Sequence, residues 1–203
     1  MVTFPGGDTL LRVGWGNDAI NIKVVGAVLA KASKLFATML SSEFIEGRTM
    51  DINLAEDEPQ VVLDFCHIIH NGELIPEIDA RRIRGLILFT DMCECQEGLK
   101  PWLLAQLGEY LRWVDRFTSY PKSNGPFPAS IEGLTIGDII AITAVWRMSD
   151  WFWKASRAYF ANGEDEDCEN LSLAGMTYAS NLPSLDGHGN FLCSMCILIS
   201  NHI

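Results

Sequence analysis

Long apolar runs are missing from this sequence. The longest one, residues 191–199, is shorter than the roughly 18 residues that a membrane-spanning helix needs, and it contains Cys193, Ser194 and Cys196. The first residues also lack the basic stretch and apolar core of a secretory signal. We therefore expect an intracellular protein with no membrane partner, in a nucleus or cytoplasm that the sequence does not distinguish.

Basic residues are few compared with acidic ones. The chain has 15 Lys and Arg against 26 Asp and Glu, which gives a formal net charge of −11. Such an excess of negative charge opposes attraction to nucleic acid and to anionic membranes. The balance favours a protein partner and predicts no nucleic-acid partner.

Motifs of common enzymes are missing as well. The sequence has no Gly-rich phosphate loop before a helix, no His-Glu-x-x-His pair and no nucleophile elbow. The acidic run Glu56–Glu58 precedes Pro59 and is typical of a helix start, where the helix dipole stabilises carboxylates. We expect no catalytic residue and no cofactor.

Six cysteines leave one enzyme class open as the alternative, a small thiol- or metal-dependent enzyme. They stand at positions 66, 93, 95, 168, 193 and 196. Cys193-x-x-Cys196 and His202 could bind a metal, but a structural zinc site needs about four ligands and no second pair stands out. We expect no metal site.

The other thiols are expected to pack in the core. Cys66 and His70 are four residues apart on a predicted helix with apolar neighbours. Cys93 and Cys95 are two apart, so in a helix they would point about 200° from each other and could not chelate one ion.

Hydrophobic residues make up 48% of the chain, enough to bury a sizeable core. Alternating residues predict a β-hairpin from Asp8–Gly14 and Ala19–Val25 and a third strand at Thr49–Leu54. Apolar residues three and four apart, including Leu35 and Met92, predict a set of helices. Their ranges are Val28–Leu40 with a break at Ser33, 59–71, Arg82–Gln96, about 101–114, Ile136–Met148 and Asp150–Ala161.

Residues that break helices and strands are dense in one stretch, which divides the chain. We expect a domain at 1–118, a linker at 119–130, a helical segment at 131–185 and an atypical tail at 186–203. The tail has no clear amphipathic period, so its deletion should leave the melting temperature almost unchanged.

The predicted order of hairpin, broken helix, strand and helices is shared with a known family. Four segments resemble its motifs: Asp8–Val13, Val28-Leu29-x-x-x-Ser33-x-x-Phe36, Phe44-Ile45-Glu46-Gly47 and Asn71-Gly72-Glu73-Leu74. Two more, Thr90–Cys95 and Leu99–Trp102, are similar to segments of its fungal members. On these residues the chain resembles the BTB/POZ domain of fungal type.

The resemblance implies a fold and a function. The fold is α+β, with a small sheet (the hairpin plus a third strand) flanked by α-helices and followed by a helical C-terminal segment. The function is protein–protein interaction without catalysis, as an oligomerisation module or a ubiquitin-ligase adaptor. Partners would be another BTB domain or a cullin-type scaffold. The signature residues expected to be structural are Asp8, Val28, Leu29, Ser33, Phe36, Gly72, Asp91 and Cys95.

Two departures from the family bear on dimerisation. Asp8 matches the acid of a charged pocket that many dimeric members have at their interface, but Gly26 stands at the basic position. Seven residues precede Asp8, too few for the strand and helix that subunits of known members exchange. We expect a monomer or a weak homodimer.

The candidate partner-binding segment is Phe44-Ile45-Glu46. In many cullin-binding members, this place holds an apolar residue, any residue and then Glu, as it does here. Phe44 could remain outside the core and insert into a groove of the partner. Alternatively, it could fold back onto Met39 and Leu40 and close the core. The sequence leaves both open.

Overall fold

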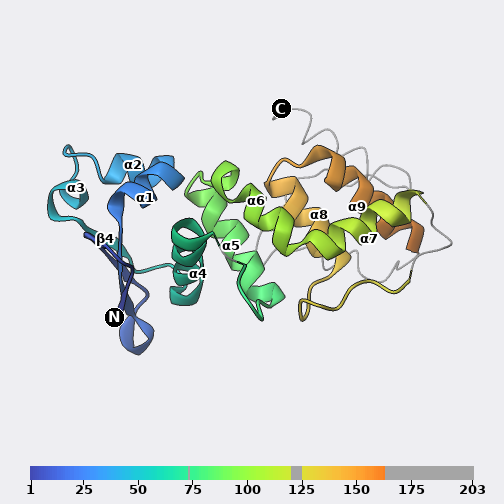
Figure 1. Ribbon diagram of the computed structural model, residues 1–203, viewed down its shortest axis with the longest axis horizontal. Coiled ribbons are helices and arrows are strands. Elements are labelled where there is room, and N and C mark those ends of the chain that lie inside the picture. The colour runs from blue at the N-terminus through green and yellow to red at the C-terminus, as the bar shows by residue number, and fades with distance from the viewer. Residues whose placement is uncertain (73, 120–124, 163–203) are drawn as a thin grey trace, which may run out of the picture.

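The fold is α+β, with a small four-stranded sheet at one end and helices packed side by side along the rest (Figure 1). The computed structural model describes residues 1–72, 74–119 and 125–162. The predicted tail at 186–203, the Cys193-x-x-Cys196 pair and His202 lie outside the described residues.

The sheet contains β1 (Val2–Thr3), β2 (Thr9–Val13), β3 (Ile20–Val24) and β4 (Asp51–Leu54), in the order β1-β3-β2-β4. Strands β2 and β3 form the predicted antiparallel hairpin, and the two outer strands pair in parallel. Leu11 and Val13 are buried while Arg12 between them is exposed, because successive side chains point to opposite faces. The short strand β1 was not predicted.

The predicted break at Ser33 is confirmed, since α1 (Gly26–Ala32) ends just before it and α2 (Lys34–Met39) begins just after it. The Ser33 hydroxyl oxygen accepts a hydrogen bond from the Phe36 N–H at 3.2 Å, which caps α2. The same hydroxyl donates to the Cys93 carbonyl at 2.5 Å. Ser33 therefore joins the helix break to the distant end of α5.

The next helices correct two predicted boundaries. A short helix, α3 (Ile45–Thr49), precedes β4 and was not predicted; Met50 ends it in a left-handed conformation with φ 54°, so β4 begins later than expected. The helix α5 (Ala80–Met92) ends before the predicted Gln96, because Glu94 also has a positive φ, 52°. Met92 was predicted to face inward, but it is 55% exposed at this helix end.

The helix α4 (Pro59–Asn71) begins and ends as predicted, with Pro59 in its first turn and Gly72 in a left-handed conformation after its last residue. The prediction that Pro101 begins a helix was wrong. Pro101 lies inside α6 (Gln96–Gln106), and α7 (Gly108–Ser119) follows as a separate helix. Pro101 comes just after the first turn of α6, so its missing N–H costs the helix one hydrogen bond, to the Glu97 carbonyl.

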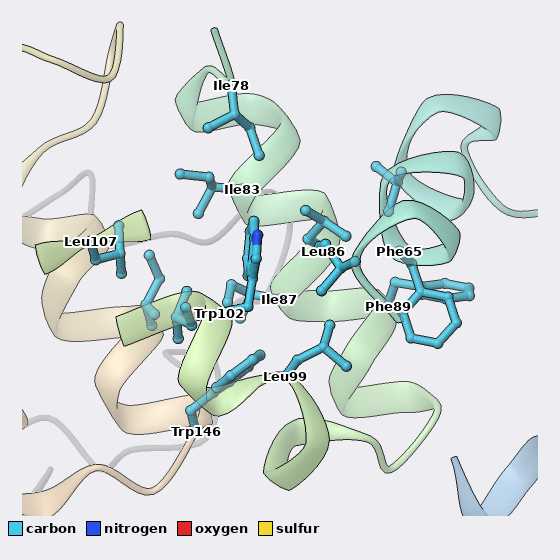
Figure 2. Packing of buried hydrophobic residues seen from close by; sticks show 14 of the residues in the cluster. Phe65, Ile78, Ile83, Leu86, Ile87, Phe89, Leu99, Trp102, Leu107 and Trp146 are labelled. Atoms are coloured by element: carbon cyan, nitrogen blue, oxygen red, sulfur yellow. The ribbon is translucent and has the colours of Figure 1, made fainter. Parts of the chain in front are cut away.

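One continuous hydrophobic cluster runs from Phe4 to Tyr159 through the described residues. Figure 2 shows its central part, where side chains of α5 lie between Phe65 of α4 and Trp102 of α6. Phe89 packs edge-on against Phe65, with ring centroids 5.2 Å apart. The sheet covers the cluster at one end, and α8 (Ile136–Val145) and α9 (Ser149–Asn162) share it at the other.

Polar contacts also attach the C-terminal helices to α5 and α7. Arg84 donates to both carboxylate oxygens of Asp138, at 2.6 and 2.7 Å, and Asp138 caps α8 with Thr135. Burial raises the pKa of Asp138, but the hydrogen bonds from Arg84 and Thr135 outweigh it and hold the pKa below its usual value. The Tyr110 hydroxyl of α7 accepts the N–H of Ile131, in the segment that precedes α8, at 2.7 Å.

Replacing Ser33 with Ala should lower the free energy of unfolding by about 2–3 kcal/mol, because the buried Phe36 N–H and Cys93 carbonyl would both lose a partner. The matched control is Thr38→Ala, which removes an exposed hydroxyl that donates to the Lys34 carbonyl within α2. That control should change stability by less than about 0.5 kcal/mol. Urea denaturation of both variants measures the difference; equal effects would contradict the role assigned to Ser33.

Candidate interaction surface

Two apolar side chains are exposed side by side at the start of α3. Phe44 is the residue before the helix and is 45% exposed, and Ile45 is its first residue and is 69% exposed. Met39 and Leu40, against which Phe44 could have folded, pack on the core as partly buried residues, but Phe44 does not join the cluster. This exposure favours the alternative in which Phe44 remains outside the core.

The backbone around Phe44 forms a tight turn. The Phe44 N–H donates to the Ser41 carbonyl at 3.2 Å, and the Arg48 guanidinium donates to the Glu43 carbonyl at 3.1 Å. Gly47 passes so close to the turn that a Cβ there would overlap the Ser41 carbonyl. The turn and α3 are therefore held together, and Phe44 and Ile45 have a defined position on the surface.

Charged residues flank this apolar pair in the sequence. Glu46 is half-buried in the first turn of α3, and Glu43 and Arg48 are on either side of it in sequence. The segment has the composition of a small interface, with an apolar centre and a polar rim.

Two more apolar side chains are exposed where α2 meets the end of α5. Leu35 is 39% exposed and Met92 is 55% exposed, although both were predicted to face inward. Leu35 is close to Ser33 in sequence and Met92 is next to Cys93. The hydrogen bond from Ser33 to the Cys93 carbonyl therefore places Leu35 and Met92 on either side of the same contact between α2 and α5. The helical spacing of apolar residues did not predict this exposure. Leu35 lies in the first turn of α2 and Met92 in the last turn of α5, where the inward face of the helix is interrupted.

The signature residues serve the fold. Leu29 and Phe36 are fully buried, and Val28 is half-buried beside them in α1. The Asp91 carboxylate accepts a hydrogen bond from the Gln96 side chain at 2.5 Å, and the buried Cys95 thiol donates to the Thr90 carbonyl at 3.4 Å. Both contacts span the turn between α5 and α6.

Asp8 and Gly26, which the resemblance places at the charged pocket of dimeric members, lie in contact. The Gly26 N–H donates to the Asp8 carboxylate at 2.7 Å, and this bond lowers the pKa of Asp8. A Cβ at Gly26 would overlap the Thr9 hydroxyl. The carboxylate therefore caps the first turn of α1, and the crowding explains why a glycine suits this position.

The described cysteines are buried and free. Burial raises the pKa of both Cys66 and Cys95 to about 12, so these thiols stay protonated at neutral pH. The assumption that Cys93 and Cys95 share a helix was wrong, because they flank Glu94 in the turn between α5 and α6. Within the described ranges, no three His, Cys, Asp or Glu side chains gather as a metal site would require.

No helix in the described part of the chain has both the length and the apolar character to cross a membrane. Comparison of the chain with protein-family models gave no match, and comparison with curated proteins gave none either.

Replacing Gly47 with Ala should lower the free energy of unfolding by about 2 kcal/mol or more, because the new methyl group would push α3 away from Ser41. Gly98→Ala is the matched control, since its Cβ would meet the Ala32 carbonyl at an ordinary 3.8 Å. Within α6 that change should stabilise the chain by up to about 1 kcal/mol. Thermal and urea unfolding test the pair, and a neutral Gly47→Ala would mean that α3 is free to move.

Proposed function

We propose that this chain is a protein-interaction module of the BTB/POZ type, similar to the fungal members of that family. The element order supports the proposal, because the hairpin, the helix broken at Ser33, the strand β4 and the helix ending at Gly72 follow one another as the resemblance implies. The signature residues lie in the core, as Leu29 and Phe36 do, or at helix ends, as Ser33 and Gly72 do. A domain of this kind acts through its surface.

The observation that carries the proposal is the exposure of Phe44 and Ile45 on a well-held turn. An exposed aromatic residue loses little conformational freedom when a partner buries it, because its backbone is already fixed. Burial of such an anchor contributes about 2 kcal/mol or more at interfaces. Glu46 beside it would fix the orientation of the partner more than its affinity.

The partner that fits this surface is a cullin-type scaffold, as the resemblance implies, and the chain would act as its adaptor. Described thiols that remain protonated give the alternative of a thiol enzyme no support. The exposed pair at α3, Phe44 and Ile45, provides instead an apolar surface through which an adaptor could bind its partner.

Phe44→Ala tests this proposal through both binding and stability. The expected result is that binding to a cullin N-terminal domain weakens by tenfold or more, since an anchor worth about 2 kcal/mol or more is removed. The free energy of unfolding should change by less than about 1 kcal/mol, because Phe44 is exposed. Calorimetric titration and urea denaturation measure the two quantities.

The control for this experiment is Leu74→Ala, which removes an exposed apolar side chain from a different loop. It should leave cullin binding unchanged. A loss of about 3 kcal/mol of stability in Phe44→Ala would assign Phe44 to the core instead. Absence of any cullin binding by the unmodified chain would end the adaptor proposal.

We also propose that the chain is a monomer or a weak homodimer. Strand β1 pairs with β3 of its own chain, in the register Val2↔Ile22 and Thr3↔Lys23, and the Asp8 carboxylate is occupied by the Gly26 N–H. Both groups are therefore engaged within one chain. Light scattering at micromolar concentration should give the monomer mass, and a tight dimer that is lost when residues 1–7 are removed would contradict this expectation.

A further inference from the structure

Two side chains from other parts of the fold cover the N-terminus of α1. The Asp8 carboxylate accepts the Gly26 N–H at 2.7 Å, and the His70 Nε2 atom accepts the adjacent Val25 N–H at 3.2 Å. Val25 is the residue that precedes the helix, so both N–H groups would otherwise lack a partner. His70 comes from the last turn of α4.

These contacts determine the state of the His70 ring. Its Nδ1 atom lies 2.9 Å from the Cys66 carbonyl, which can only accept, so Nδ1 carries the proton. Nε2 must then be unprotonated in order to accept from Val25. A doubly protonated ring would direct an N–H at the Val25 N–H and would add positive charge at the positive end of α1. The arrangement therefore requires neutral His70.

The same ring supports the N-terminal strand. The Phe4 ring packs on His70, with centroids 4.5 Å apart, and on His67, with centroids 5.0 Å apart. Phe4 is buried directly after β1, and its N–H donates to the Lys23 carbonyl of β3 at 2.8 Å. Since β1 has two residues, of which only Val2 packs on the core, the buried Phe4 ring adds an important apolar contact that keeps this segment on the sheet.

When Nε2 is protonated, the Val25 N–H loses its acceptor, and the other charged groups around His70 do not replace it. Asp8 bonds the neighbouring Gly26 N–H, and Lys23 on β3 lies close enough to lower the pKa of Asp8. On α5, the arginines that reach α4 pair with Glu58 and Asp64, toward the other end of that helix. The remaining charged side chains on the helices against α4 are Lys31 at the far end of α1, Arg84 and Asp91 on α5, and Glu97 and Lys100 on α6. Arg84 bonds Asp138, and Asp91 bonds Gln96.

We propose that His70 is a pH-sensitive latch for the N-terminal strand. Neutral His70 holds Phe4, and with it β1, against β3; protonation breaks the bond to Val25, displaces the ring under Phe4 and releases β1. Release uncovers the edge of β3, whose backbone groups become available to another strand. Because histidine changes charge between about pH 5 and 8, mild acidification operates the latch. This inference concerns a different face of the fold from α3 and does not depend on the proposed adaptor function.

Hydrogen exchange of the full chain tests the latch. The Phe4 N–H should lose about tenfold in protection factor between pH ~7.5 and pH ~5.5, after correction for the intrinsic exchange rate, as expected for local opening. Amides of the central strand β2 should keep their protection. Unchanged protection at Phe4, or an equal loss in β2, would overturn the proposal.

The variant His70→Gln tests whether His70 is the group that makes Phe4 protection depend on pH. A glutamine amide can donate to the Cys66 carbonyl and accept from Val25 without titrating, so Phe4 protection should no longer depend on pH in this variant. The matched control His67→Gln also removes a ring that contacts Phe4, but the tenfold loss should persist. A loss that persists in His70→Gln, or disappears in His67→Gln, would assign the effect elsewhere.

A measurement on the unmodified chain covers the case in which His70→Gln fails to fold. Nitrogen chemical shifts of the His70 ring should show the proton on Nδ1 at neutral pH, and the ring should become doubly protonated only at pH values where Phe4 protection has already fallen. A ring protonated on Nε2 at neutral pH, or a doubly protonated ring with Phe4 protection unchanged, would overturn the latch.

Discussion

The hydroxyl of Ser33 is the contact on which the arrangement of the N-terminal half depends. It accepts a hydrogen bond from Phe36 and donates one to the Cys93 carbonyl, so a single buried atom both begins α2 and attaches it to the end of α5. Without the break, α1 would continue in its own direction and the next residues would not reach α5. With it, α2 turns, and the chain proceeds through a tight turn to α3 and back to the sheet at β4.

The exposed pair at α3 follows from this geometry. Because α2 uses Phe36 to enter the core, the turn after it lies at the periphery, where Phe44 and Ile45 meet solvent. Gly47 lets α3 approach the turn closely, and this approach limits the freedom of both side chains. A surface that is apolar, small and held in place has the physical properties expected of a partner-binding site.

Local patterns in the sequence predicted the hairpin, the break at Ser33 and both ends of α4, because each depends on residues close together in the chain. Pro101 was misinterpreted because proline is common at helix starts, whereas here the helix begins a turn earlier. The short strand β1 and the contacts of His70 depend on distant segments, as in the Val25–His70 bond, and α3 depends on the close approach of Gly47 to Ser41. For the candidate site, the sequence identified Phe44 and Ile45, but their exposure required the structure.

The continuous core has a consequence for how the chain unfolds. Ile139 and Ala158 are buried in the same cluster as Phe36, and Arg84 bonds Asp138 across the boundary between α5 and α8. Unfolding of the C-terminal helices by heat or force therefore also loosens the packing of α5, the helix to which Ser33 is hydrogen-bonded. Denaturation would be cooperative across both halves, and a ligand bound at one end would also stabilise the other.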